Sequence, residues 1–199
     1  MSKCPVLTAL AITMAMSAAN AQTTPAPAPK PQASPQAAAR PSPYRYGGLS
    51  GAWLMPSGDF GDIAADGWAI SLDGYQFMDP AKKIAVGSEI GYYDFGEKNG
   101  VDVSNFPVDL VLKVFPKGDR SKVRPFIQGG IGFNYTKVES YRATASDYYF
   151  GTQAGFGFTV HGGGAAAFKV SGTYHWIFAS GVDPEFWSLR GGILIPMSR

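Results

Sequence analysis

The sequence predicts an all-β fold, an eight-stranded antiparallel up-and-down transmembrane β-barrel. Three observations predict it. Large apolar residues alternate with small or polar ones at a period of two in eight separate segments, which is the pattern of strands and not of helices. After residue 43, no apolar stretch is long enough to cross a bilayer as a helix. Compact turns and more polar loops alternate between the segments, and this arrangement is typical of outer-membrane barrels.

Residues 1–43 form a leader whose composition differs from that of the body, residues 44–199. The leader holds eight of the 15 prolines, whereas every glycine, every aromatic residue and every acidic residue lies in the body. The body carries 14 Lys or Arg and 15 Asp or Glu, so its formal charge is −1. A nearly neutral body excludes a nucleic-acid binder that depends on a basic patch.

Residues 1–21 predict a cleavable signal peptide. Lys3 supplies a positive start, Val6 to Met16 an apolar core, and Ala19-Asn20-Ala21 a cleavage site. The alternative is an N-terminal membrane anchor, but the apolar core is too short to span a bilayer. The only cysteine, Cys4, lies in this segment, so the exported chain has no thiol for a disulfide, a metal or nucleophilic catalysis. Because there are only two histidines in all, we expect no metal and no cofactor.

Residues 22–43 predict a periplasmic linker that is rich in Pro and Ala. Such a composition cannot bury a core and favours extended polyproline II structure. The linker is either a passive spacer or a tether that touches the cell wall or a periplasmic partner.

The strands follow in order along the body. The first, residues 45–55, places Leu49, Trp53 and Met55 on one face and Ser50 and Ala52 on the other. The same alternation continues in residues 68–73, 84–93, 106–116, 127–135, 153–160, 168–176 and 187–195. We expect compact turns at 79–83, 116–122 and 161–164, and polar loops at 56–66, 96–104, 138–147 and 179–185. With the N-terminus in the periplasm, these four loops face the outside of the cell.

The two faces of the strands distinguish two kinds of barrel. A soluble barrel of the lipocalin type would turn its large apolar side chains inward. In this chain the face that carries the charges also carries many Gly, Ala and Ser, which suit a narrow lumen, whereas the large apolar residues suit lipid. Aromatic residues near the strand ends predict the two interfacial girdles of a membrane barrel: Trp53, Trp68, Tyr92, Tyr135, Tyr148, Trp176 and Trp187. The β-propensity of aromatic residues alone would explain their presence in strands but not these positions.

The inward face predicts a polar network that fills the lumen. Its main members are Asp73, Glu89, Asp109, Lys113, Lys169, His175 and Arg190. Three acids and three bases in a narrow interior should pair, because an unpaired buried charge is costly. The network is either a plug that fixes the strand register or a gated ion path, and the narrow lumen favours the plug.

The body resembles the OmpA/OmpX-like family of small eight-stranded outer-membrane barrels. The resemblance is carried by Arg124-Pro125-Phe126-Ile127-Gln128-Gly129-Gly130-Ile131-Gly132-Phe133, and more weakly by Asp79-Pro80 and Gly155-Phe156-Gly157. It implies partners that include outer-membrane lipid, lipopolysaccharide and, during biogenesis, the barrel-assembly machinery. Such barrels usually finish on an aromatic residue, whereas this chain finishes Ile195-Pro196-Met197-Ser198-Arg199.

A lipid A-modifying enzyme is the catalytic alternative. His175-Trp176-Ile177-Phe178-Ala179-Ser180 resembles the lipid A deacylase region, but Ile177 occupies the place where that family has its serine. We therefore expect no enzyme activity and a structural, envelope-integrity role. The alternative is a surface barrel that binds or adheres through its loops, where Tyr141, Arg142 and Tyr148 could contact an unnamed ligand.

Overall fold

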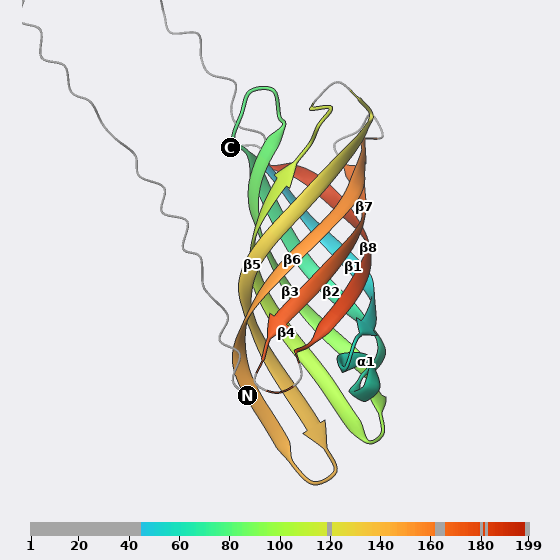
Figure 1. Ribbon diagram of the computed structural model, residues 1–199. Helices are drawn as coiled ribbons and strands as arrows, with labels where there is room; N and C mark the ends of the chain where they lie inside the picture. Colours follow the sequence, from blue (N-terminus) through green and yellow to red (C-terminus); the bar gives the residue numbers. More distant parts are fainter. Residues whose placement is uncertain (1–44, 119–120, 162–165, 180, 182, 198–199) are drawn as a thin grey trace, which may run out of the picture. The chain divides into compact units, whose positions relative to one another are not determined.

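The computed structural model describes residues 45–118, 121–161, 166–179, 181 and 183–197. The predicted signal peptide and linker lie outside these residues. The strands are β1 (Arg45–Ser57), β2 (Ala65–Phe77), β3 (Ile84–Lys98), β4 (Val101–Val114), β5 (Val123–Ser140), β6 (Thr144–His161), β7 (Ala167–Phe178) and β8 (Glu185–Met197). Each strand pairs antiparallel with the next, and β8 pairs with β1 to close the barrel (Figure 1). The predicted eight-stranded up-and-down barrel is confirmed.

Side chains alternate between the two walls of the barrel, as the period of two requires. On β4, Val108, Leu110 and Leu112 are about half exposed on the outer wall, whereas Asp109 and Lys113 are buried inside. The other strands repeat this division at mid-barrel, whereas large apolar side chains such as Phe95 and Phe115 also lie inside, nearer the two ends of the barrel. No helix in the described part of the chain is long and apolar enough to cross a membrane.

Two of the predicted polar loops are mostly strand, which corrects the sequence-based expectation. Only Asn99 and Gly100 separate β3 from β4, and both have positive φ, 56° and 73°. Left-handed conformations at both central residues are what a tight two-residue hairpin needs, and Asn-Gly provides them at low cost. Residues 141–143 alone separate β5 from β6. The predicted loops at 96–104 and 138–147 are therefore the ends of hairpins.

These two hairpins extend the barrel wall at the end that carries the loops. The β4–β5 ladder continues to the pair Val101↔Ser140, and the β5–β6 ladder to Glu139↔Thr144. On the next side, β6 pairs with β7 only from Phe150↔Phe178 onward. Strands β3 to β6 thus form a protruding sheet, and residues 144–149 are its edge toward β7. Figure 1 shows both hairpins reaching past the strand ends of β7 and β8.

A short helix, α1 (Phe60–Ile63), lies in the first loop, where the sequence predicted only irregular structure. Its Phe60 is 2% exposed and packs edge-on against Phe95 of β3, with ring centroids 5.1 Å apart. Lys98 of β3 donates a hydrogen bond to the carbonyl oxygen of Gly61. The helix thereby brings an aromatic ring over the loop end of the interior.

Candidate functional site

The interior of the barrel holds a band of polar side chains that come from every strand. All seven residues predicted for the lumen lie in it, and each is at most 7% exposed: Asp73, Glu89, Asp109, Lys113, Lys169, His175 and Arg190. Serine, threonine, asparagine and glutamine side chains fill the spaces between them. We call this band the lumen network.

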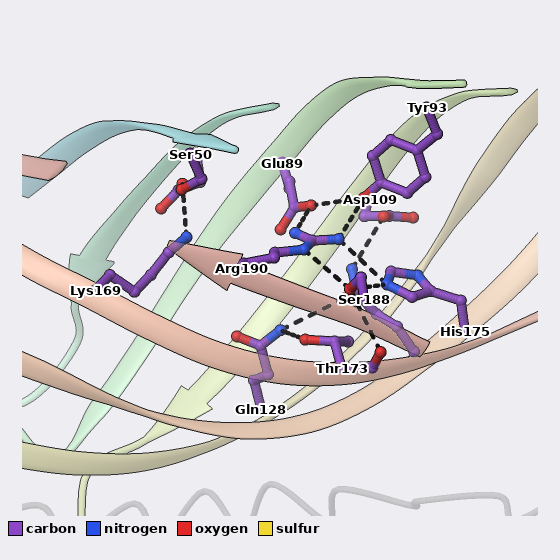
Figure 2. Close-up of polar contacts among 12 residues, drawn as sticks. Ser50, Glu89, Tyr93, Asp109, Gln128, Lys169, Thr173, His175, Ser188 and Arg190 are labelled. Atoms are coloured by element: carbon purple, nitrogen blue, oxygen red, sulfur yellow. Dashed lines mark hydrogen bonds and ion pairs between the residues drawn. The ribbon is translucent and has the colours of Figure 1, made fainter. Parts of the chain in front are cut away.

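Arg190 of β8 is the most connected member of the network (Figure 2). Its Nη1 donates to Glu89 Oε1 in an ion pair, and its Nη2 donates to the Tyr93 hydroxyl. Nη2 also lies 3.2 Å from His175 Nε2, and Nε donates to Ser188 Oγ at 3.1 Å. The Tyr93 hydroxyl donates in turn to Glu89 Oε1 at 3.0 Å. One guanidinium therefore joins side chains from β3, β7 and β8.

A second ion pair lies in the same band. Lys169 Nζ of β7 donates to Asp73 Oδ1 of β2 at 2.7 Å, and Ser50 Oγ of β1 donates to the same oxygen at 2.9 Å. Both charged side chains are at most 3% exposed. Replacing one member of such a deeply buried ion pair is costly, because the other member is left as an uncompensated buried charge.

The third predicted ion pair is absent among the described residues. Asp109 accepts a hydrogen bond from Gln153 Nε2 at 3.0 Å, whereas Lys113 Nζ lies 5.0 Å from the ring centroid of Tyr75 and 5.3 Å from that of Phe126. Asp109 and Lys113 share one face of β4 but are four residues apart. An extended strand separates them by more than the length of an ion pair, so each finds a different partner.

The register places three acids side by side. Asp73 is the cross-strand partner of Glu89, and Glu89 is that of Asp109. Like charges at opposite positions repel each other. Lys169 and Arg190 form ion pairs with Asp73 and Glu89, and the uncharged amide of Gln153 donates a hydrogen bond to Asp109, so each of the three carboxylates has a partner.

Two apolar layers border the lumen network. The loop-end layer contains Leu54, Phe60, Ala64, Ala69, Tyr93, Phe95, Val103, Ile177 and Phe186. The turn-end layer contains Tyr46, Tyr75, Phe77, Ala85, Phe115, Phe126, Ala167 and Leu194. The charged band thus lies between two layers built largely from aromatic rings, which pack edge-on or tilted against one another.

Sequence reasoning missed several members of this interior, among them Tyr93 and Asn105. Tyr93 is the last residue of the predicted strand 84–93. It lies four residues after Glu89, so the alternation places both side chains on the same face. Asn105, just beyond a predicted loop, donates to Asn134 Oδ1 at 2.9 Å and accepts from the Thr136 hydroxyl at 3.3 Å. Following the alternation to the last residue of the predicted strand 84–93, and extending the strand 106–116 by one residue, would have found both.

A serine and a histidine meet inside the barrel. Ser188 Oγ lies 3.0 Å from His175 Nε2 across the β7–β8 ladder, a contact that the sequence did not suggest because the residues are on different strands. Catalysis by such a pair needs an accessible hydroxyl and a nitrogen free to take its proton. Ser188 is 1% exposed, and Arg190 Nη2 lies 3.2 Å from the same His175 nitrogen. The serine hydroxyl is therefore enclosed by the barrel wall and hydrogen-bonded within it.

The seven predicted girdle residues lie on the outer wall as one belt, and not as two girdles. Trp53 and Trp68 are cross-strand partners, and Trp68 contacts Tyr92 with ring centroids 5.8 Å apart. Tyr135 contacts Tyr148 at 5.0 Å. All seven, including Trp176 and Trp187, belong to the half of the barrel nearer the loops. At the turn end, no Trp or Tyr among the described residues points outward, so the prediction of a second girdle from these residues is wrong.

Comparisons with known proteins show which solved structures share this fold. No family model matches the chain, and no curated protein sequence matches it. Among solved structures, Neisserial surface protein A superposes with a TM-score of 0.65 at 12% identity, covering 76% of this chain and 96% of that one. A major outer-membrane protein of Thermus thermophilus gives 0.55 at 11% identity, covering 77% and 99%. Ail, the attachment invasion locus protein of Yersinia pestis, gives 0.52 at 14% identity, also covering 77% and 99%.

These similarities concern the fold, because all three identities are low. The comparison structures share with this chain the closed antiparallel barrel that its alternating strands predicted. The chain therefore has the fold of the small OmpA/OmpX-like outer-membrane β-barrels.

Proposed function

We propose that this protein is an integral outer-membrane barrel that stabilises the envelope of a Gram-negative bacterium and whose interior is closed. One observation carries the proposal: the lumen network lies between two aromatic-rich layers, so an ion would have to cross both layers and the paired charges. Outer-membrane lipid and lipopolysaccharide surround the outer wall in this proposal, and the assembly machinery inserts the chain.

The proposal keeps the protein non-enzymatic. The hydroxyl of Ser188 is enclosed by the barrel wall, and Ile177 belongs to the loop-end layer. Neither position offers an acyl chain a route to a nucleophile.

The closed interior predicts that the purified protein gives no discrete conductance steps in planar bilayers. In the same proposal, deleting the gene should make cells sensitive to detergent, and both the wild-type protein and Ser188→Ala should restore resistance equally. The physical reason is that the wall and its packing stabilise the envelope, whereas the serine only accepts and donates hydrogen bonds inside it.

Insertion is verified beforehand by protease protection of the reconstituted barrel. Regular conductance steps from inserted wild-type protein would contradict the closed interior. Failure of Ser188→Ala to restore resistance, at normal protein levels, would contradict the structural role and support catalysis.

Surface binding is the second candidate function, and the protruding sheet favours it. Its tip carries Tyr141, which is 81% exposed and stacks under the Arg142 guanidinium at 4.8 Å, and its edge carries Tyr148, which is 72% exposed. Edge strands with unpaired backbone groups can accept a further strand from a partner. Ail, one of the proteins with this fold, is named for attachment and invasion.

If the protruding sheet binds a surface ligand, Tyr141→Ser with Tyr148→Ser should reduce attachment of expressing cells to host-cell monolayers by about tenfold, since aromatic and Arg side chains dominate such contacts. A cysteine at position 143 should be labelled on intact cells, which checks that the tip is outside. Trp53→Ser serves as the control, because Trp53 belongs to the aromatic belt but lies on β1, outside the protruding sheet. Equal attachment by the double variant would exclude this sheet as the binding surface.

A further inference from the structure

The turn end of the barrel differs in charge from the loop end. The three turn stretches, residues 79–83, 116–122 and 161–164, contain four Lys, one Arg and two Asp, a formal charge of +3. The four loop stretches, 56–66, 96–104, 138–147 and 179–185, contain nine acids, one Lys and one Arg, a formal charge of −7. An anion that approaches the molecule is therefore attracted to the turn end and repelled from the loop end.

A pocket of about 620 Å³ lies at the turn end between the β2–β3 and β4–β5 turns. Its lining residues are Pro80, Ala81, Lys83, Pro116, Lys117, Gly118 and Ser121. Lys83 comes from one turn and Lys117 from the other, and both side chains are exposed. Among the described residues, neither lysine forms an ion pair. The partly exposed Ser121 adds a hydroxyl to the lining, so the pocket offers two cations and a further hydrogen-bond donor.

The pocket is held in shape by the two turns. Asp79 Oδ1 accepts the backbone N–H groups of Lys83 and Ile84, at 2.8 and 2.7 Å, so this carboxylate already has partners within its own turn. The backbone N–H of Phe115 donates to the carbonyl oxygen of Lys83 at 2.7 Å and ties the turns together. Gly118 has a φ of 54° and lies against Ala81, where a side chain would collide with the backbone. These contacts hold the two turns together, so that Lys83 and Lys117 line the same pocket.

The lipid-facing wall begins directly beside this pocket. Ile84 follows Lys83 in the chain and is 44% exposed on the outer wall, and its cross-strand partner is Val114. Met78 and Leu112, 65% and 48% exposed, continue the apolar surface. A molecule with acyl chains along this wall would therefore hold its headgroup at Lys83 and Lys117. That combination of an apolar wall and a cationic pocket fits a phospholipid and not a free ion.

We propose that the turn-end pocket binds the phosphate of an anionic phospholipid headgroup, with Lys83 and Lys117 as its cationic ligands and the lipid's acyl chains on the outer wall of β3 and β4. This site goes beyond the structural role proposed above and does not depend on whether the lumen conducts. Basic residues near a membrane surface each strengthen binding to anionic lipid by about fivefold.

Native mass spectrometry of the full chain tests the site. The protein is released from nanodiscs that contain equal amounts of phosphatidylglycerol and phosphatidylcholine, and the lipid that remains bound is counted. We expect wild type to retain phosphatidylglycerol in excess, and Lys83→Gln with Lys117→Gln to reduce that excess by about 25-fold, fivefold for each lysine. Lys83→Arg with Lys117→Arg should preserve it, because the charges remain.

The matched control is Lys137→Gln with Arg142→Gln, which removes two positive charges from the loop end, the exposed Arg142 and the partly exposed Lys137 that pairs with Glu139. An unchanged excess in the Lys83/Lys117 double glutamine variant would overturn the site. An equal loss in the loop-end control would also overturn it, since the effect would then reflect net charge alone. Displacement of the bound phosphatidylglycerol by millimolar inorganic phosphate would assign the pocket to free phosphate and overturn the lipid as its ligand.

Discussion

Replacing Arg190 by Met is expected to lower the free energy of unfolding by about 3 to 5 kcal/mol, because Glu89 would be left as a buried charge without its cation. The change also removes the donors to Tyr93, His175 and Ser188. Methionine keeps much of the volume of the side chain, so the loss would come from charge and hydrogen bonding more than from a cavity. Equilibrium unfolding by urea in lipid vesicles measures it.

Two further variants show whether the ion pair is the cause. Glu89→Gln combined with Arg190→Met should cost less than the sum of the single changes, because residues in direct contact do not behave additively. Lys113→Met is the control for removing a buried cation. This lysine lies against Tyr75 and Phe126 and forms no ion pair in the described part of the chain, so its loss should cost much less than the loss of Arg190. Strict additivity of Glu89→Gln and Arg190→Met would contradict the coupling.

The inward position of these charges could be predicted from the sequence, but their pairing could not. The period of two fixes which wall each side chain faces, and this is enough to place Asp73, Glu89 and Arg190 inside. Pairing depends on the shear of the closed barrel, which determines the level at which non-neighbouring strands face each other. Arg190 of β8 reaches Glu89 of β3 across the lumen, and no local pattern contains that information.

The strand ends were the least predictable part of the fold. Composition favoured loops at 96–104 and 138–147 because these stretches are polar, yet strands outside a membrane need no apolar face. Asn99-Gly100 is a strong hairpin signal and could have corrected the first of them. Helix α1 has no comparable signal, because four residues are too few for a helical period. Likewise, that the aromatic residues form a single belt depends on how far along the barrel axis each of them lies. A position near a strand end does not by itself show at which end of the barrel the residue lies.

Placing an arginine at Leu110 is expected to cost about 2 to 4 kcal/mol of stability in lipid, because the outer wall at this depth faces hydrocarbon. Leu110 is 56% exposed and lies on β4 between Phe106, beside the aromatic belt, and Val114 at the turn end. Its cross-strand partners are Ser88 and Ile131. Urea unfolding in vesicles again provides the measurement, with Leu110→Ala separating the loss of packing from the cost of the charge.

The depth of the substitution is what distinguishes a lipid-facing wall from any other apolar surface. Tyr148→Arg places the same charge in the aromatic belt, where it should cost no more than about 1 kcal/mol, because the charge can reach water and headgroups there. A soluble barrel would show no such gradient, and its body would stay folded and monomeric in plain buffer. Equal costs at positions 110 and 148 would therefore contradict the membrane-spanning wall, whereas a cost that falls from mid-barrel to the belt follows from lipid around the apolar face.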